Sequence, residues 1–561
     1  MIDPLVLGYN ALNKKIRLTS EERKTHMHVI GSSGSGKSKF LEWMIRGDLN
    51  NGQGFCLIDP HGKLYDDVMA YCAHHVLRRP IIPLNLSAGD QIVSFNPFQK
   101  AGQETVEVQV DKRIAATLHA WGVRNSDGTP TLERTLRLFY TVMIDQNLGL
   151  ADLEHLIDFN AHEIRGHLIE RLQNPLIQKE LQELQKLKAR DWREETLSAK
   201  NRLFRLLTSP ALRRVMGLPD RAMDLKAAMD DGKILLVNLA PSDRLSDEHA
   251  RVFGALLINE FYETALRRDD RNPTPYYLYI DEFQEFVVTP NIAKMLDEMR
   301  KFGLYTILSH QRFGQLTDDL VDALTNCKIK AVFGGLPVKW ARYMAEELFI
   351  NELDPKRIKV AIYQTKFWPT YTRDTVYTHA SSTGRFAGRS DQWSHATLGG
   401  QASGQFFQPN DWFSGGPAIS LTTNTSDSSV FGGSRTDGDS SNETDAQADI
   451  PTLLPVPFKE LSSVQYFPLD EQLTQLTAAL KEQFPRHCFI KIHEQKTQPM
   501  LVPFVEDYHT PPSNLAWYVQ TLLKEQNALP AAEVDRLIKE RKDALLKAAI
   551  GHNALPEDFH E

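Results

Sequence analysis

Short apolar runs alternate with helical stretches through the first two thirds of the chain. Seven of these runs are apolar almost throughout, which is typical of strands buried on both faces of a parallel sheet. The pattern therefore predicts an α/β fold with a mostly parallel sheet covered by helices. The seven expected strands are His26–Gly31, Phe55–Asp59, Ile81–Asn85, Ile234–Asn238, Tyr276–Asp281, Tyr305–Ser309 and Lys330–Gly334.

One long stretch, Val106–Asp231, lacks strand signals and lies between the third and fourth expected strands. Its apolar residues recur at helical spacing, as in Leu132, Leu136 and Phe139. We expect an all-α insertion over residues 106–231. It would divide the α/β core into residues 1–105 and 232–380.

Residues 381–450 contain 30 Ser, Thr or Gly among 70 positions and no Lys, with no sustained period of 2 or 3.6. Such a composition predicts a flexible linker or insertion. Residues 451–561 are expected to form a small C-terminal α+β unit. Its expected helices are Glu471–Gln483 and Pro530–Ile550, with strands at Phe489–His493 and Leu501–Val505.

Composition excludes a fibrous or fully disordered chain, because 42% of the 561 residues are hydrophobic. The formal charge of −8 is unevenly distributed. Residues 1–380 carry 50 Lys and Arg against 49 Asp and Glu, whereas residues 381–450 have 3 against 8 and residues 451–561 have 11 against 15. The acidity lies in the last third, so the net charge does not exclude a nucleic-acid partner for the rest.

The four cysteines stand far apart with no CxxC pair, which argues against a disulfide framework or a cysteine-rich zinc site. We find no signal peptide and no apolar run of about 18 residues, the length that spans a membrane. We therefore expect a cytoplasmic protein with no membrane span.

The strongest chemical signal is a glycine-rich loop of the form GxxxxGK[ST] between an expected strand and a helix. Backbone N–H groups of such a loop surround phosphates, and the helix N-terminus favours anions. Lys37 would reach the β- and γ-phosphates of ATP, and Ser38 would bind Mg²⁺. The alternative is a Gly/Ser-rich turn with an incidental lysine. The loop consists of Gly31, Ser32, Ser33, Gly34, Ser35, Gly36, Lys37 and Ser38.

Two acids and a glutamine follow later strands. Asp281 fits a residue that holds Mg²⁺ through water, and Glu282 fits a base that orients or deprotonates the attacking water. Gln311 could contact the γ-phosphate or that water. Taken alone, the acids could cap a helix and Gln311 could belong to an exposed turn. With the upstream phosphate loop, the acids indicate ATP hydrolysis.

Arg300 ends a helical segment just before the strand at Leu304. A cation there could simply complement the helix dipole. It could also project into a neighbouring subunit's nucleotide as an arginine finger.

Taken in chain order, several motifs resemble the HerA/FtsK superfamily of P-loop ATPases, and most closely its TraG/TraD-like branch of conjugative DNA-transfer ATPases. The resemblance covers about Leu7–Glu347 and rests on GSSGSGKS, LIDPHG, SFNP, IDEFQEF, EMRKFGL and SHQ.

The resemblance implies a RecA-like core, a hexameric ring that moves DNA, and an inserted all-α domain. Lys37 and Ser38 match the Walker A positions, Asp281 and Glu282 the Walker B pair, and Gln311 the sensor glutamine. Arg300 falls on the arginine that acts as a finger in trans.

The function expected from these observations is an ATP-hydrolysing, ring-forming DNA translocase that uses ATP and Mg²⁺. Arg312, Lys328 and Lys330 are weak candidates for DNA contacts, because a solvated surface charge is the more common role for each of them. One alternative is a HerA-like scaffold that activates an effector such as a nuclease. Its effector, or a relaxase-type partner, would bind through the acidic linker and the C-terminal segment. A motor for protein secretion is a third option.

Overall fold

The computed structural model describes residues 3–100, 102, 104–123, 130–286, 291–384, 396–405, 419–428 and 440–553. The chain forms two compact units. The core unit contains the residues up to Leu353 and those from Leu469 onward, and the ribbon unit contains Asp354–Pro468.

An 11-stranded sheet organises the core unit. Seven adjacent strands are parallel, in the order β10-β3-β9-β8-β4-β7-β5. They correspond to the seven expected strands, so the α/β prediction is confirmed. The strands are β3 (Met27–Ile30), β4 (Gly54–Asp59), β5 (Ile81–Asn85), β7 (Ile234–Asn238), β8 (Tyr276–Ile280), β9 (Leu304–His310) and β10 (Ile329–Phe333).

Both faces of this parallel sheet are buried, which explains the continuous apolar runs. Val29 and Ile30 are neighbours on β3, yet they belong to different hydrophobic cores. Phe55 and Cys56 on β4 divide in the same way. Because successive side chains point to opposite faces of a strand, a strand covered on both sides has no polar face to reveal its period.

Helices cover the two faces. Those contributing to one core are α1 (Lys37–Asn51), α2 (Lys63–His74) and α16 (Pro512–Glu525). Those contributing to the other include α11 (Asp247–Leu266), α12 (Asn291–Glu298), α13 (Asp318–Thr325), α14 (Val338–Phe349) and α15 (Leu469–Lys481). In the part of the chain that the structure describes, no helix combines the length and hydropathy needed to cross a membrane.

Between β5 and β7 the chain forms a helical region, preceded by the short strand β6 (Gln91–Ile92). The described regular elements over residues 106–231 are all helical. Besides short 3₁₀ turns they are α3 (Val106–Ala120), α4 (Pro130–Asp145), α5 (Leu153–Ile157), α6 (His162–Glu170), α7 (Pro175–Gln185), α8 (Ala189–Thr208), α9 (Pro210–Val215) and α10 (Leu225–Asp230).

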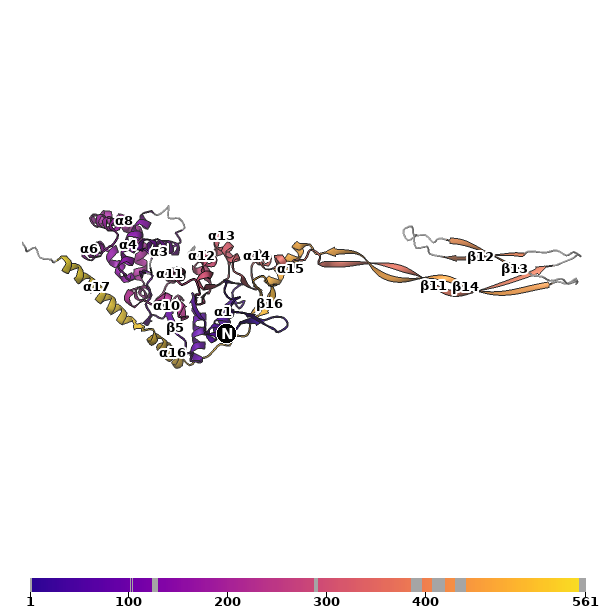
Figure 1. The fold of residues 1–561 in the computed structure, drawn as a ribbon, viewed down its shortest axis with the longest axis horizontal. Coiled ribbons are helices and arrows are strands. Elements are labelled where there is room, and N and C mark those ends of the chain that lie inside the picture. The colour runs from indigo at the N-terminus through magenta and orange to yellow at the C-terminus, as the bar shows by residue number, and fades with distance from the viewer. Residues whose placement is uncertain are drawn as a thin grey trace, which may run out of the picture. The chain divides into compact units, whose positions relative to one another are not determined.

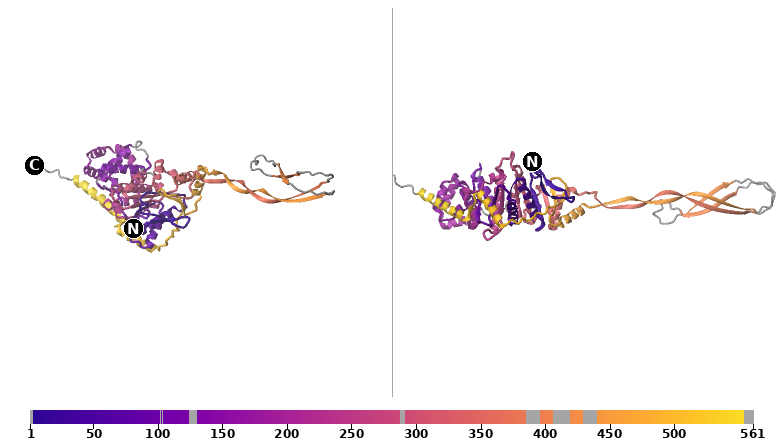
Figure 2. Two further views of the ribbon diagram at one scale, coloured as in Figure 1. Left: turned by 45° about the vertical axis from the view of Figure 1, so that its right-hand side comes forward. Right: turned by 90° about the horizontal axis from the view of Figure 1, so that it is seen from below.

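Four antiparallel strands extend the sheet beyond β10, in the order β15-β16-β1-β2. They are β15 (His487–Ile492), β16 (Gln498–Leu501), β1 (Leu5–Tyr9) and β2 (Lys15–Leu18). The C-terminal segment and the N-terminal strands lie side by side in both views of Figure 2. The expectation of a separate unit over residues 451–561 is therefore wrong, because β15 pairs with β10 and so belongs to the sheet of the core unit. The second expected strand there is also displaced, from Leu501–Val505 to β16.

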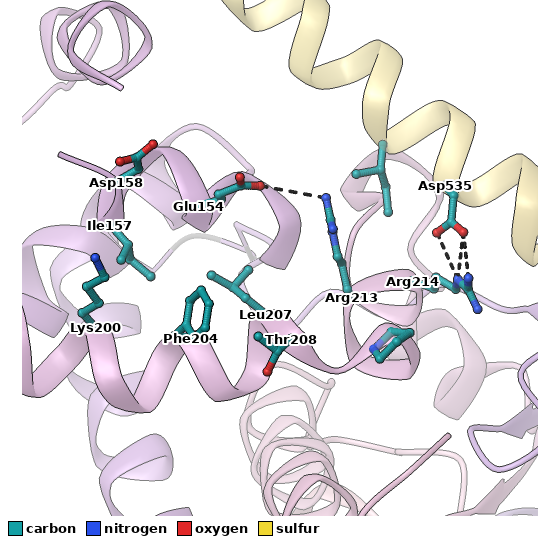
Figure 3. A pocket seen from close by; sticks show the side chains of 12 residues that line it. Glu154, Ile157, Asp158, Lys200, Phe204, Leu207, Thr208, Arg213, Arg214 and Asp535 are labelled. Carbon is teal, nitrogen blue, oxygen red and sulfur yellow. Dashed lines mark hydrogen bonds and ion pairs between the residues drawn. The ribbon is translucent and has the colours of Figure 1, made fainter. Parts of the chain in front are cut away.

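The chain end returns to the helical insertion. Strand β17 (Leu529–Pro530) pairs with β6, and α17 (Ala531–Asn553) packs against α6 (Figure 1). Asp535 of α17 binds Arg214 of the insertion at 2.7 Å, beside a cavity of about 740 Å³ (Figure 3). These contacts fix α17 on the insertion.

The ribbon unit contains two antiparallel pairs of strands. The long strands β11 (Ile358–Gly384) and β14 (Ser440–Tyr466) pair along their length (Figure 1), and β12 (Ala396–Gln405) pairs with β13 (Ile419–Ser428). The expected linker over residues 381–450 is thus wrong for its described strands, and the first part of the core unit ends at Leu353 rather than at residue 380. Where side-chain burial is described, both faces of the β11–β14 pair are largely exposed, so burial imposes no alternation of apolar and polar residues there.

Removal of the ribbon unit should leave the core unit folded. Ile358 pairs with Tyr466, and the Phe467 N–H donates to the Arg357 carbonyl at 2.9 Å, so the two ends of the ribbon adjoin. Replacing residues 358–466 with a short Gly/Ser linker should retain a cooperative thermal transition, measured by circular dichroism. A chain truncated at Ala380 should lose that transition, because it lacks β15 and β16. Loss of the transition in the internal deletion would contradict this division of the chain.

Candidate active site

The sequence-predicted groups converge because three neighbouring strands end at one edge of the sheet. Strand β9 lies between β3 and β8, with Ile30 opposite His310 and Ile280 opposite Leu308. The glycine-rich loop follows β3, the two acids follow β8 and Gln311 follows β9. This carboxyl edge is where parallel sheets present functional side chains.

Two glycines of the loop are required by its shape. Gly36 caps α1 with φ +108°, a left-handed conformation that side chains rarely adopt. A Cβ on Gly31 would lie 2.5 Å from the Cβ of Phe333 on β10. The loop also bonds to the chain after β10, because the Ser32 N–H donates to the Gly334 carbonyl at 3.0 Å.

Lys37 lies inside the loop that it would serve. Its Nζ donates to the Ser32 carbonyl at 3.0 Å and lies 3.9 Å from Glu282 Oε1. Only 4% of the residue is exposed. Burial lowers the pKa of the ammonium, and the charges of Glu282 and Asp281 oppose that effect. A phosphate chain in the loop would supply the negative charge that this buried cation favours.

Ser38 and Asp281 are also brought together. The Ser38 hydroxyl donates to Asp281 Oδ2 at 3.2 Å, across 243 positions of sequence. Burial raises the pKa of Asp281 to about 6, with further contributions from the neighbouring carboxylates of Glu282 and Asp59. A cation bound beside Asp281 would favour its ionised form.

Glu282 occupies a strained backbone position. Its φ is +44°, which is uncommon for a residue with a side chain and costs on the order of 1–3 kcal/mol. Its carboxylate accepts hydrogen bonds from the amide groups of Gln311 and Gln284. The acid and the glutamine proposed to sense hydrolysis are therefore in direct contact.

A buried pair of imidazoles lies on the strands that lead to the site, directly before Gln311 on β9 and on the neighbouring β3. Nε2 of His28 on β3 and Nε2 of His310 on β9 are 2.7 Å apart. Burial lowers the pKa of both rings, that of His310 to about 3. Both are therefore neutral near pH 7, and one Nε2–H donates to the other ring. This bond ties the strand before the loop to the strand before Gln311.

The site residues suit a magnesium nucleotide. Mg²⁺ prefers oxygen ligands, and in phosphate-transfer sites it takes only one or two from protein because phosphates and water supply the rest. Ser38 Oγ and Asp281 Oδ2 are such oxygens, already within hydrogen-bond distance. Lys37 and the loop N–H groups suit the phosphates.

Arg300 lies away from these groups. It belongs to the 3₁₀ turn η5 (Met299–Phe302), which precedes β9, whereas Gln311 follows β9. The seven residues of β9 separate the two sheet edges by roughly 20 Å. The Arg300 side chain is exposed, and its Nε donates to the Lys24 carbonyl at 3.2 Å.

The three basic residues expected near DNA have different environments. Arg312 is exposed just after β9, and Lys328 is exposed before β10 with Glu494 at 3.9 Å. The expectation for Lys330 is wrong. It lies within β10 rather than in a loop, only 8% exposed and ion-paired with Glu347, because the sheet continues into β15 on that side.

Sequence reasoning left two neighbours of this site unassigned. Asp59 ends β4, is 1% exposed and accepts hydrogen bonds from the N–H groups of His61 and Tyr65. Its position after an apolar strand was an available signal. Arg486 is 449 positions after Lys37, and its N–H donates to the Ser35 carbonyl of the loop at 2.9 Å. A backbone contact of this kind has no signature in sequence.

The chain matches no protein-family model, and no curated protein resembles it significantly in sequence. Its structure is similar to the unbound bacterial conjugative coupling protein TrwBdeltaN70, with 13% identity, a TM-score of 0.51 and coverage of 91% of this chain and 92% of that one. TrwB in complex with ADP and Mg²⁺ gives 13% identity, a TM-score of 0.49 and coverage of 91% and 93%. VirB4 of Thermoanaerobacter pseudethanolicus gives 14%, 0.41, and 61% and 87%.

At such low identity the first of these likenesses bears on the fold alone. It agrees with the mostly parallel sheet and its covering helices. The chain has the α/β, RecA-like P-loop ATPase fold of the conjugative coupling protein TrwB.

Proposed function

We propose that this chain is an ATP-hydrolysing motor that assembles as a ring, most simply a hexamer, and moves DNA. The observation that carries the proposal is the convergence of Lys37, Ser38, Asp281, Glu282 and Gln311 at one sheet edge. The fold is shared with a protein described as a bacterial conjugative coupling protein. That description supports DNA transfer as the work coupled to hydrolysis.

The proposed hydrolysis divides the work among these side chains. Lys37 and the loop N–H groups would hold the phosphates, and Ser38 and Asp281 would hold Mg²⁺, which would neutralise charge on the phosphate oxygens. Glu282 orients the water and accepts its proton, because its carboxylate lies beside both Lys37 and Gln311. Gln311 would respond to the loss of the γ-phosphate and shift the position of the chain that follows β9.

Arg300 supports an assembled motor. It lies at the sheet edge opposite its own nucleotide loop, so a contact with nucleotide requires another copy of the chain. An arginine supplied in trans would stabilise charge in the transition state and make hydrolysis depend on assembly.

A scaffold that recruits an effector protein is the second candidate, and the ribbon unit favours it. Trp368, Tyr371 and Tyr377 are exposed by 63–76% on β11. Exposed aromatic side chains of this kind are common at protein interfaces. The C-terminal segment, in contrast, is already packed within the core unit, because β15 and β16 pair in the sheet and α17 contacts the helical insertion.

DNA should stimulate ATP turnover. Phosphate contacts release counterions, so the stimulation should be greatest at low salt and fall steeply as salt rises. Steady-state turnover with and without single- and double-stranded DNA measures this, with Lys37→Ala as the inactive control. Turnover that is indifferent to DNA, with no DNA binding at any salt concentration, would exclude the translocase and favour the scaffold.

The Glu282→Gln variant should bind ATP normally but hydrolyse it roughly 100-fold or more slowly, because the shape is kept and the base is lost. Binding is measured by calorimetry and turnover by phosphate release. Glu285→Gln makes the same change three positions later and should keep normal turnover. Near-normal hydrolysis in Glu282→Gln would remove that residue from the mechanism.

Mixing Arg300→Ala subunits with Lys37→Ala subunits should restore turnover. In a randomly mixed ring about a quarter of the interfaces pair an intact loop with an intact arginine, so activity should exceed that of either parent. Lys301→Ala subunits, altered at the neighbouring exposed cation, should be active without mixing. A mixture no better than its more active parent would argue against a finger in trans.

A further inference from the structure

The C-terminal segment passes directly over the start of α1. A Cβ added to Gly36 would lie 3.1 Å from the backbone nitrogen of Arg486, and the Arg486 N–H donates to Ser35. Arg486 has φ +69°, so it shares with Glu282 a left-handed backbone beside the phosphate loop. The strained backbone of Arg486 brings this segment against the loop.

The Arg486 side chain links the loop to a second stretch of the same segment. Its Nε and Nη2 both donate to the Val502 carbonyl, at 3.1 and 2.8 Å. Its guanidinium carbon lies 5.6 Å from the ring centroid of Phe504. The residue that contacts the loop through its backbone therefore also holds its cation beside the Phe504 ring.

Residues after Phe504 are anchored along α1. Asp507 pairs with Lys39 at 2.6 Å, and the Glu506 carbonyl accepts from Arg46 at 2.8 Å. The backbone around Phe504 is thus fixed on both sides, yet 70% of the residue is exposed. A large apolar ring held in solvent beside a phosphate loop is suited to stacking on a ligand.

We propose that Phe504, supported by Arg486, is the platform on which the base of the nucleotide stacks. This inference rests on the proposed nucleotide function. Asp281, Glu282 and Gln311 surround the position of the γ-phosphate, so the base, at the other end of the nucleotide, lies on the opposite flank of the loop. Phe504 and Arg486 border that flank at the start of α1.

Stacking on one ring predicts a particular binding pattern. Every base offers a flat π-face, so the platform would accept different bases and contribute affinity rather than strict selection. A ligand with the same phosphates but no base would gain nothing from it. The C-terminal segment would thereby belong to the nucleotide site, although it lies more than 440 positions beyond the loop in sequence.

Calorimetry with the full chain in Mg²⁺ tests this, with ADP and inorganic pyrophosphate as ligands. Phe504→Ala should weaken ADP binding by roughly 5- to 150-fold, which corresponds to about 1–3 kcal/mol for stacking of one base, and leave pyrophosphate binding unchanged. Phe504→Trp should retain ADP affinity. Phe204→Ala removes another exposed ring, 55% accessible in the helical insertion, and should bind both ligands normally.

Unchanged ADP affinity in Phe504→Ala would overturn the proposal, as would an equal loss for both ligands, which would indicate damage to the loop. If the unaltered chain bound neither ADP nor ATP, the proposed function itself would fail. The two failures are therefore distinguishable.

Discussion

The candidate site depends on one constraint, the adjacency of three parallel strands buried on both faces. Strands β3, β9 and β8 end at the same sheet edge. The residues that directly follow them, a cationic loop, a glutamine and two acids, therefore lie in one small region. That region is costly for the empty protein, because Lys37, Asp281 and Glu282 are all nearly inaccessible to water. A magnesium nucleotide would supply the charges that these groups lack.

The C-terminal segment adds further contacts around the site and the helical insertion. Strand β15 continues the sheet past β10, Arg486 contacts the loop, and α17 reaches the helical insertion. One segment of the chain therefore contacts both the phosphate loop and the helical insertion. The ribbon unit interrupts the chain just before this segment begins.

Much of this architecture was predictable because it is encoded locally. Strands such as β4 and β8 are apolar runs, and the loop before Lys37 has a fixed spacing. Arg486 was not predictable, because its contact is a backbone hydrogen bond between distant residues. The β11–β14 strands were missed because burial imposes no pattern on them, and Lys330 was misjudged because β15 was not expected beside it.

The most direct test of the central claim is thermal unfolding of the full chain with increasing MgADP, compared between the unaltered protein and Lys37→Ala. A ligand that binds only the folded state raises Tm progressively with its concentration. The account predicts such a rise for the unaltered protein and little or none for Lys37→Ala. No rise at millimolar MgADP, or an equal rise in both proteins, would contradict a nucleotide site at this sheet edge.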